Sequence, residues 1–133
     1  MMKIILVSED EDKKRRLSKM IDDIGYKAPM VADTAQSAFD VMKDVTFDMV
    51  IVDEHLPDMS GVAFIRQLIM KNPMANCALF SSLSSEDFHE STEGLGIIGK
   101  IPLNFSVEDI KQLFDQLAQI LGLFTVKPAG GQS

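Results

Sequence analysis

The stretch VIVDEHLPDMSG, residues 50–61, passes from an apolar run directly into a group of acids, a histidine, a proline and a glycine. An apolar run of this kind is typical of a strand that is buried on both faces of a sheet. The functional groups of open parallel sheets gather where such strands end. Asp53 stands at that end, which makes it the first candidate for a functional residue.

Similar apolar runs recur along the chain and alternate with stripes of apolar residues at helical spacing. The predicted strands are IILV at 4–7, a weaker KAPMV at 27–31, MVIV at 49–52, CALF at 77–80 and II at 97–98. The stripes predict helices around residues 17–24, 35–42, 64–69 and 110–121. This alternation predicts an α/β fold with a doubly wound, five-stranded parallel sheet and helices on both faces.

The fourth predicted helix has a weak apolar face. The segment SSEDFHESTEGLG, residues 84–96, begins with the capping residue Ser84, yet Phe88 is its only large apolar residue before Leu95. A helix with so little to bury gains little from packing. We therefore expect the fourth helix to be short or irregular.

Length and composition predict one cytoplasmic domain. The 133 residues suffice for a single core, and we place a domain at 1–122 and a flexible tail or the start of a linker at 123–133. No apolar stretch approaches the roughly 20 residues that a membrane-spanning helix needs. The opening MMKIILV is too short for a secretory signal, so we expect a cytoplasmic location and no membrane contact.

Charge and cysteine content narrow the function further. A net charge of -7 argues against direct binding of nucleic acid by this domain, because phosphate backbones need a cationic surface. The basic cluster KKRR at 13–16 is flanked by acids, and we interpret it as a solvated helix face. The single Cys77 is interpreted as a small buried hydrophobic residue.

Polar side chains that follow the predicted strands should meet at one edge of the sheet. They are the acidic run Ser8–Asp12, Asp53, Ser81 with Ser82, and Gly99 with Lys100. Crowded carboxylates repel one another, and a hard divalent cation such as Mg²⁺ relieves that repulsion. A lysine and a hydroxyl beside the ion favour an oxyanion, above all a phosphoryl group. The residues therefore predict a phosphoryl-accepting or phosphate-binding site centred on Asp53.

The chain resembles the receiver domains of two-component response regulators. DEHLPDMSG at 53–61 is similar to the family's phosphoacceptor aspartate and the loop that follows it, and residues 3–26 resemble the family's first strand and helix. Ser81 and Lys100 fall where the family keeps its hydroxyl residue and its lysine. The resemblance covers about residues 3–121.

This resemblance implies a function and a set of roles. Asp53 would take a phosphoryl group from a histidine kinase or phosphotransfer protein, and the domain would signal by binding a downstream effector protein. Glu9, Asp53 and the main-chain carbonyl of His55 would hold Mg²⁺, while Lys100 and Ser81 would contact phosphate oxygens. We expect no enzymatic activity beyond the domain's own phosphorylation and dephosphorylation.

Several positions depart from the family pattern. The gapless register, which we favour, places Ser8 and Glu9 where the family has two acids; a register slipped by one would pair Glu9 with Asp10 instead. The longer carboxylate of Glu9 or the charge lost at Ser8 predicts weakened Mg²⁺ binding. Ile97 replaces an aromatic residue, and one residue is inserted between Lys100 and its proline.

Other interpretations stay open at this point. Asp53 could cap a turn, Glu9 could be a solvated acid, Ser81 could simply end a strand, and Lys100 could be a surface charge. The alternative function is a pseudo-receiver, a phosphorylation-independent protein-interaction module with the same fold. A flavin-binding protein of similar topology is disfavoured, because acids follow the first strand where a phosphate-binding loop is needed.

Overall fold

The computed structural model describes residues 2–122. The predicted tail at 123–133 lies outside the described residues. Strands and helices alternate along the chain, as the sequence predicts. In chain order they are β1 (Ile4–Val7), α1 (Glu11–Asp23), β2 (Met30–Ala32), α2 (Ala35–Met42), β3 (Met49–Val52), α3 (Gly61–Lys71), β4 (Cys77–Phe80), α4 (Ser85–Thr92), β5 (Gly99–Ile101) and α5 (Val107–Ile120).

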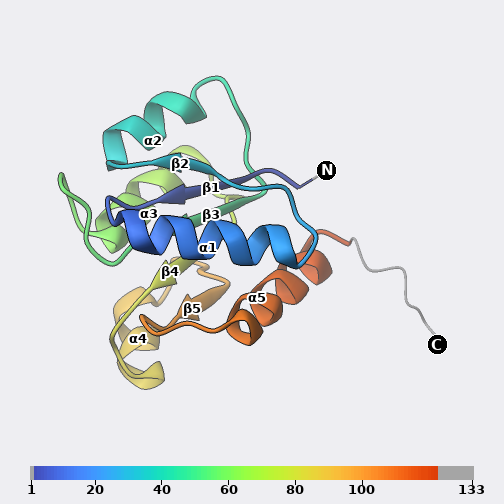
Figure 1. Cartoon of the computed structure of the whole chain (residues 1–133). Helices are drawn as coiled ribbons and strands as arrows, with labels where there is room; N and C mark the ends of the chain where they lie inside the picture. The colour runs from blue at the N-terminus through green and yellow to red at the C-terminus, as the bar shows by residue number, and fades with distance from the viewer. Residues whose placement is uncertain (1, 123–133) are drawn as a thin grey trace.

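The strands form one parallel sheet in the order β2-β1-β3-β4-β5. Figure 1 shows the sheet between its covering helices. The prediction of a doubly wound α/β fold is therefore confirmed. The direction of winding reverses between β1 and β3, and open α/β sheets bind ligands in the crevice outside the strand ends at such a reversal. Asp53 directly follows β3 at this point.

Two apolar cores lie on opposite faces of the sheet. In β1, Ile4 and Leu6 belong to the core with α1 and α5, whereas Ile5 and Val7 belong to the core with α2 and α3. All four residues of β3 are buried, as expected for a strand that is covered on both faces. This double burial fixes the position of the polar residues that follow the central strands.

The fourth helix is short, as predicted. α4 has 8 residues, and Ser84 caps it by accepting a hydrogen bond from the amide of Asp87. Its buried residues are Phe88 and Thr92, and the Thr92 hydroxyl donates to the carbonyl of Phe88 at 2.7 Å. With one large apolar anchor, α4 has less packing area than a longer amphipathic helix would have.

The second and fifth strands begin later than predicted. β2 starts at Met30 rather than at residue 27, and β5 covers Gly99–Ile101 rather than residues 97–98. The apolar pattern does not reveal the true extent of β5 because the strand begins with Gly99, where an added Cβ would lie 2.8 Å from a methyl group of Leu113. Close packing against α5 thus places a glycine inside a strand. Lys100 therefore lies within β5 and not after it.

Burial governs the chemistry of Cys77, a free thiol in β4 with no exposed surface. Desolvation raises the pKa of this thiol to about 12. The prediction of a buried hydrophobic cysteine is confirmed.

No helix within residues 2–122 is both long and apolar enough to cross a membrane.

Candidate functional site

Three polar residues stand at the carboxyl ends of neighbouring strands, namely Ser8 after β1, Asp53 after β3 and Ser81 after β4. Each amide N–H donates to a main-chain carbonyl of the adjacent strand, at 2.9 Å for Ser8 and Asp53 and 3.0 Å for Ser81. These bonds extend the sheet by one residue. The three side chains are therefore positioned by the sheet itself and not by mobile loops.

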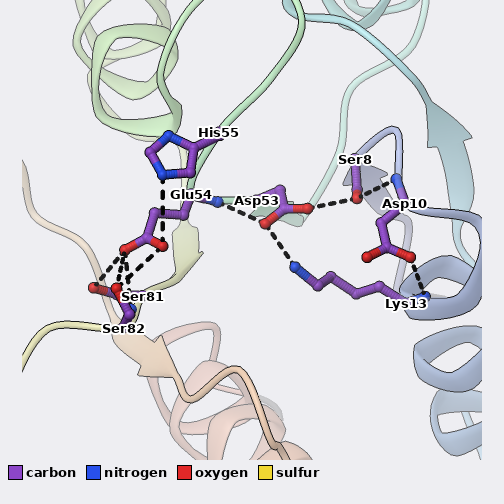
Figure 2. A network of polar contacts seen from close by, with 8 residues as sticks. All are labelled: Ser8, Asp10, Lys13, Asp53, Glu54, His55, Ser81 and Ser82. Atoms are coloured by element: carbon purple, nitrogen blue, oxygen red, sulfur yellow. Dashed lines mark hydrogen bonds and ion pairs between the residues drawn. The ribbon is translucent and has the colours of Figure 1, made fainter.

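The carboxylate of Asp53 is the centre of the site and is nearly buried, with 7% of the residue exposed. Its Oδ2 accepts a hydrogen bond of 2.7 Å from the hydroxyl of Ser8. Its Oδ1 accepts from the amide of Glu54 and from the Lys13 ammonium, both at 2.8 Å. Figure 2 shows Ser8 and Lys13 reaching Asp53 from different sides. Three hydrogen bonds, one of them from a cation, thus satisfy this nearly buried carboxylate.

Lys13 reaches this carboxylate from the first turn of α1. Its main-chain amide donates to the capping carboxylate of Asp10 at 3.1 Å, which fixes the main chain from which the side chain extends. Its ammonium lies 4.7 Å from the centre of the Phe80 ring, a cation–π distance. Only 14% of the Lys13 side chain is exposed.

The interpretation of KKRR as a solvated helix face is wrong for its two lysines. Lys14 is buried and forms ion pairs with Asp33 and Glu11, which raise its pKa. Arg15 and Arg16 are exposed, as expected. Helical periodicity alone cannot find Lys13 or Lys14, because a long lysine side chain can leave its own face of the helix and reach a neighbouring strand end.

Glu54 links the ends of β3 and β4 and was also missed by the sequence analysis. Its carboxylate accepts from the amide of Ser82 at 2.9 Å and from the Ser82 hydroxyl at 3.0 Å. The hydroxyl of Ser81 lies 3.5 Å from the same carboxylate. Figure 2 shows Glu54 pointing away from Asp53 toward the two serines. The carboxylate of Glu54 thus holds the loop that precedes α4.

The polar side-chain atoms of Ser81 and Lys100 have partners other than Asp53. Ser81 is buried, and its hydroxyl oxygen accepts from the amide of Leu83 at 3.1 Å in addition to its contact with Glu54. The ammonium of Lys100 donates to the carbonyl of Leu83 at 2.8 Å. The cation paired with Asp53 is Lys13, which comes from a different element.

The acidic side chains near the expected Mg²⁺ site face solvent or have other partners. Glu9 is exposed. The carboxylate of Asp10 caps α1, and both oxygens of Asp53 already accept hydrogen bonds. Within residues 2–122 no cluster of three or more His, Cys, Asp or Glu residues could hold a metal ion. Mg²⁺ prefers near-octahedral oxygen ligands, so the ion would have to displace Lys13 or Ser8 from the carboxylate of Asp53.

The loop between β3 and α3 is shaped by Gly61 and Asp58. The amide of Gly61 donates to the carbonyl of Glu54 at 2.9 Å, and an added Cβ at Gly61 would lie 2.1 Å from the carbonyl oxygen of Asp53. The Asp58 carboxylate accepts from the first two amides of α2, both at 3.0 Å, and these bonds lower its pKa. The loop therefore connects Asp53 to the starts of two helices.

Comparison with known proteins points to one family. The family model described as response regulator receiver domain matches residues 4–115. The chain is 22% identical over 123 residues to chemotaxis protein CheY-3 of Vibrio cholerae, covering 90% of this chain and 94% of that protein. It is 26% identical to a protein-glutamate methylesterase/protein-glutamine glutaminase of Pseudomonas putida, of which it covers 32%.

Solved structures share the fold. The chemotaxis response regulator CheY4 of Vibrio cholerae superposes with a TM-score of 0.79 at 19% identity, over 88% of this chain and 98% of that one. A response regulator receiver domain protein from Clostridium thermocellum gives a TM-score of 0.81 at 14% identity, over 92% and 98% of the two chains. At these identities the likeness establishes the common architecture.

Proposed function

Because the chain belongs to the family of response regulator receiver domains, we propose that it accepts a phosphoryl group on Asp53 and signals by binding a partner protein. The observation that carries this proposal is the carboxylate of Asp53 itself. This carboxylate is nearly buried at the end of β3, beside the point where the direction of winding reverses. It is paired with the ammonium of Lys13. A charged carboxylate in that position can act as a nucleophile.

The proposed reaction forms an acyl phosphate on Asp53. One carboxylate oxygen attacks the phosphorus of a phosphohistidine on a kinase or phosphotransfer protein. The new P–O bond forms as the P–N bond breaks, and the bonding electron pair passes to the imidazole nitrogen. Catalysis of such transfers consists mainly of positioning and of stabilising the charge on the phosphoryl oxygens. Cationic and hydroxyl side chains beside Asp53 therefore favour the reaction.

Phosphorylation also offers a way to change the face that binds a partner. For Lys100 to reach a phosphoryl oxygen, its ammonium must leave the carbonyl of Leu83. For Ser81 to do the same, its hydroxyl must turn away from Glu54. We propose that these two exchanges move the loop before α4 and thereby alter binding of a downstream effector protein.

Receiver domains generally bind Mg²⁺ at the acidic site, and the proposed ligands here are Glu9, Asp53 and the main-chain carbonyl of His55. These residues would have to rearrange, because Glu9 is exposed and Lys13 is paired with Asp53.

A pseudo-receiver is the second candidate function. It is favoured by the ion pair between Lys13 and Asp53 and by the hydrogen bonds that hold Ser82 to Glu54. Both could keep the domain in one conformation that binds its partner without phosphorylation.

Incubation with acetyl phosphate, followed by phosphoprotein gel retardation, distinguishes the two. We expect a retarded band for the wild type and for the surface control Asp44→Ala, and none for Asp53→Ala. A wild type that is not retarded with or without Mg²⁺ would instead support the pseudo-receiver. A band that persists in Asp53→Ala would contradict the assignment of the phosphoacceptor.

A further inference from the structure

Lys13 occupies a position that its own helix disfavours. It lies in the first turn of α1, next to Glu11 and Asp12. The amino end of a helix carries a partial positive charge, so a cation there is repelled whereas acids are stabilised. Lys13 also has little contact with water, and lysine is rarely withdrawn from water unless it is paired. Its placement is therefore explained by tertiary contacts and not by the stability of the helix.

Those contacts all direct the ammonium toward Asp53. The 2.8 Å ion pair joins Lys13 Nζ to Asp53 Oδ1, and the ring of Phe80 lies beneath the same ammonium. Both side chains are largely shielded, with 14% of Lys13 and 10% of Asp53 exposed. Electrostatic attraction at such a site is screened less than at the surface.

We propose that the ammonium of Lys13 is the built-in counter-ion of Asp53 and takes the place of a divalent cation at this site. Ser8 contributes by donating a hydrogen bond to Asp53 where a second carboxylate would repel it. The ammonium balances the charge of Asp53 itself, which weakens the attraction of this carboxylate for a metal ion. The exposed position of Glu9 agrees with this balance.

The same ammonium can assist phosphoryl transfer, and this part of the inference rests on the proposed function. The ammonium of Lys13 already donates a hydrogen bond to Asp53 Oδ1. A phosphoryl group would be joined either to this oxygen or to Oδ2 of the same carboxylate. When the phosphoryl group arrives, Lys13 can shift from the carboxylate to a phosphoryl oxygen and stabilise its charge. With acetyl phosphate the P–O bond of the donor breaks, acetate leaves with the electron pair, and the acyl phosphate of Asp53 forms.

Metal binding tests the counter-ion directly, without any need for phosphorylation. Free Mn²⁺ is measured by electron paramagnetic resonance during titration of the wild type, Lys13→Met, Lys13→Arg and Lys19→Met. Lys19 is an exposed residue of the same helix, so Lys13→Met and Lys19→Met remove the same charge from the whole protein. We expect Lys13→Met alone to bind Mn²⁺ more tightly, by about tenfold or more, the size of effect that neighbouring groups have on metal affinity.

Equal Mn²⁺ affinity in Lys13→Met and Lys19→Met would overturn the counter-ion proposal. Thermal unfolding of each variant shows whether it is folded. If Lys13→Met does not fold, Lys13→Gln, which keeps a polar end without the charge, provides the comparison with Lys19→Met. Lys13→Arg is expected to behave as the wild type, because it keeps the cation.

Phosphorylation by acetyl phosphate in the presence of EDTA tests whether Lys13 assists phosphoryl transfer. We expect the wild type to be phosphorylated, and Lys13→Met to be slower by about a hundredfold, the cost of removing one group that stabilises transition-state charge. Added Mg²⁺ should restore the rate of Lys13→Met more than that of the wild type. If the wild type requires Mg²⁺ and Lys13→Met is phosphorylated at the same rate as Lys19→Met, the inference fails while the proposed function stands. If no variant is phosphorylated either with EDTA or with added Mg²⁺, but Lys13→Met gains Mn²⁺ affinity, the proposed function fails while the counter-ion stands.

Discussion

The hydroxyl of Ser8, which has no exposed surface, donates a 2.7 Å hydrogen bond to the carboxylate of Asp53. The same hydroxyl accepts from the amide of Asp10 at 3.1 Å. Ser8 thus joins the end of β1 to the end of β3 and to the cap of α1. A carboxylate in its place would lie close to that of Asp53, where two negative charges repel.

Ser8→Asp should therefore increase metal binding and lower stability. We expect Mg²⁺ affinity, measured by titration calorimetry, to rise by about tenfold, because a second carboxylate adds both a ligand and a negative charge. Without metal, the free energy of unfolding should fall by about 1–3 kcal/mol, the usual cost of leaving a buried polar group poorly matched. Ser8→Ala removes the hydroxyl without adding charge. Equal Mg²⁺ affinity in Ser8→Asp and Ser8→Ala would contradict this expectation.

Glu54→Ala should loosen the loop that leads into α4. The amide of Ser82 donates to the Glu54 carboxylate at 2.9 Å, and loss of that acceptor exposes the amide to water. We expect hydrogen exchange at Ser82 to become about tenfold faster, in line with a hydrogen bond worth about 1–1.5 kcal/mol. Glu90→Ala, at an exposed position within α4, is the control. Unchanged exchange at Ser82 would show that Glu54 does not hold the loop.

Gly61→Ala should be strongly destabilising because its Cβ would meet the main-chain carbonyl of Asp53 at 2.1 Å. Backbone cannot move aside as a side chain can, so we expect a loss of about 3 kcal/mol, the upper end for overpacking. Gly99→Ala meets a methyl group of Leu113 at 2.8 Å, and that flexible side chain can shift. Urea unfolding of the two variants checks the difference. A smaller loss for Gly61→Ala than for Gly99→Ala would be inconsistent with the close approach.

Asp58 should give a pH-dependent contribution to stability. Hydrogen bonds from the amides of Ala35 and Gln36 lower the pKa of Asp58 below its ordinary value of 3.8 in the folded protein. Its contribution is therefore fully present above that value and is lost as the pH falls through the lower, folded pKa. We expect Asp58→Ala to lower the free energy of unfolding at neutral pH by about 1 kcal/mol, the usual net worth of a hydrogen bond, because the amides of Ala35 and Gln36 lose their acceptor.

The difference between wild type and Asp58→Ala should shrink as urea unfolding is repeated at pH values below 3.8. Asp44→Ala, an exposed position after α2, serves as the control and should show no such trend. A difference that stays constant across this pH range would mean that the carboxylate of Asp58 is not what holds α2.

The sequence predicts the architecture and the end of β3 well, because both follow from runs of buried apolar residues. Asp53 and Ser81 lie directly after such runs, so their positions are determined by the main chain. The role of Lys13 was missed because it depends on where a long side chain extends, and periodicity reports only the direction in which it leaves the helix. Lys100 was placed after a strand because Gly99 interrupts the apolar pattern of β5.

The measurement that tests the central claim most directly is identification of the phosphorylated residue. The protein is treated with acetyl phosphate and then with borohydride, which reduces an acyl phosphate of aspartate to homoserine, and the modified residue is located by peptide mass spectrometry. We predict homoserine at position 53 and none there when acetyl phosphate is omitted. Homoserine at another aspartate such as Asp10, or its absence from a protein that remains folded throughout the treatment, would contradict the claim that Asp53 is the phosphoacceptor.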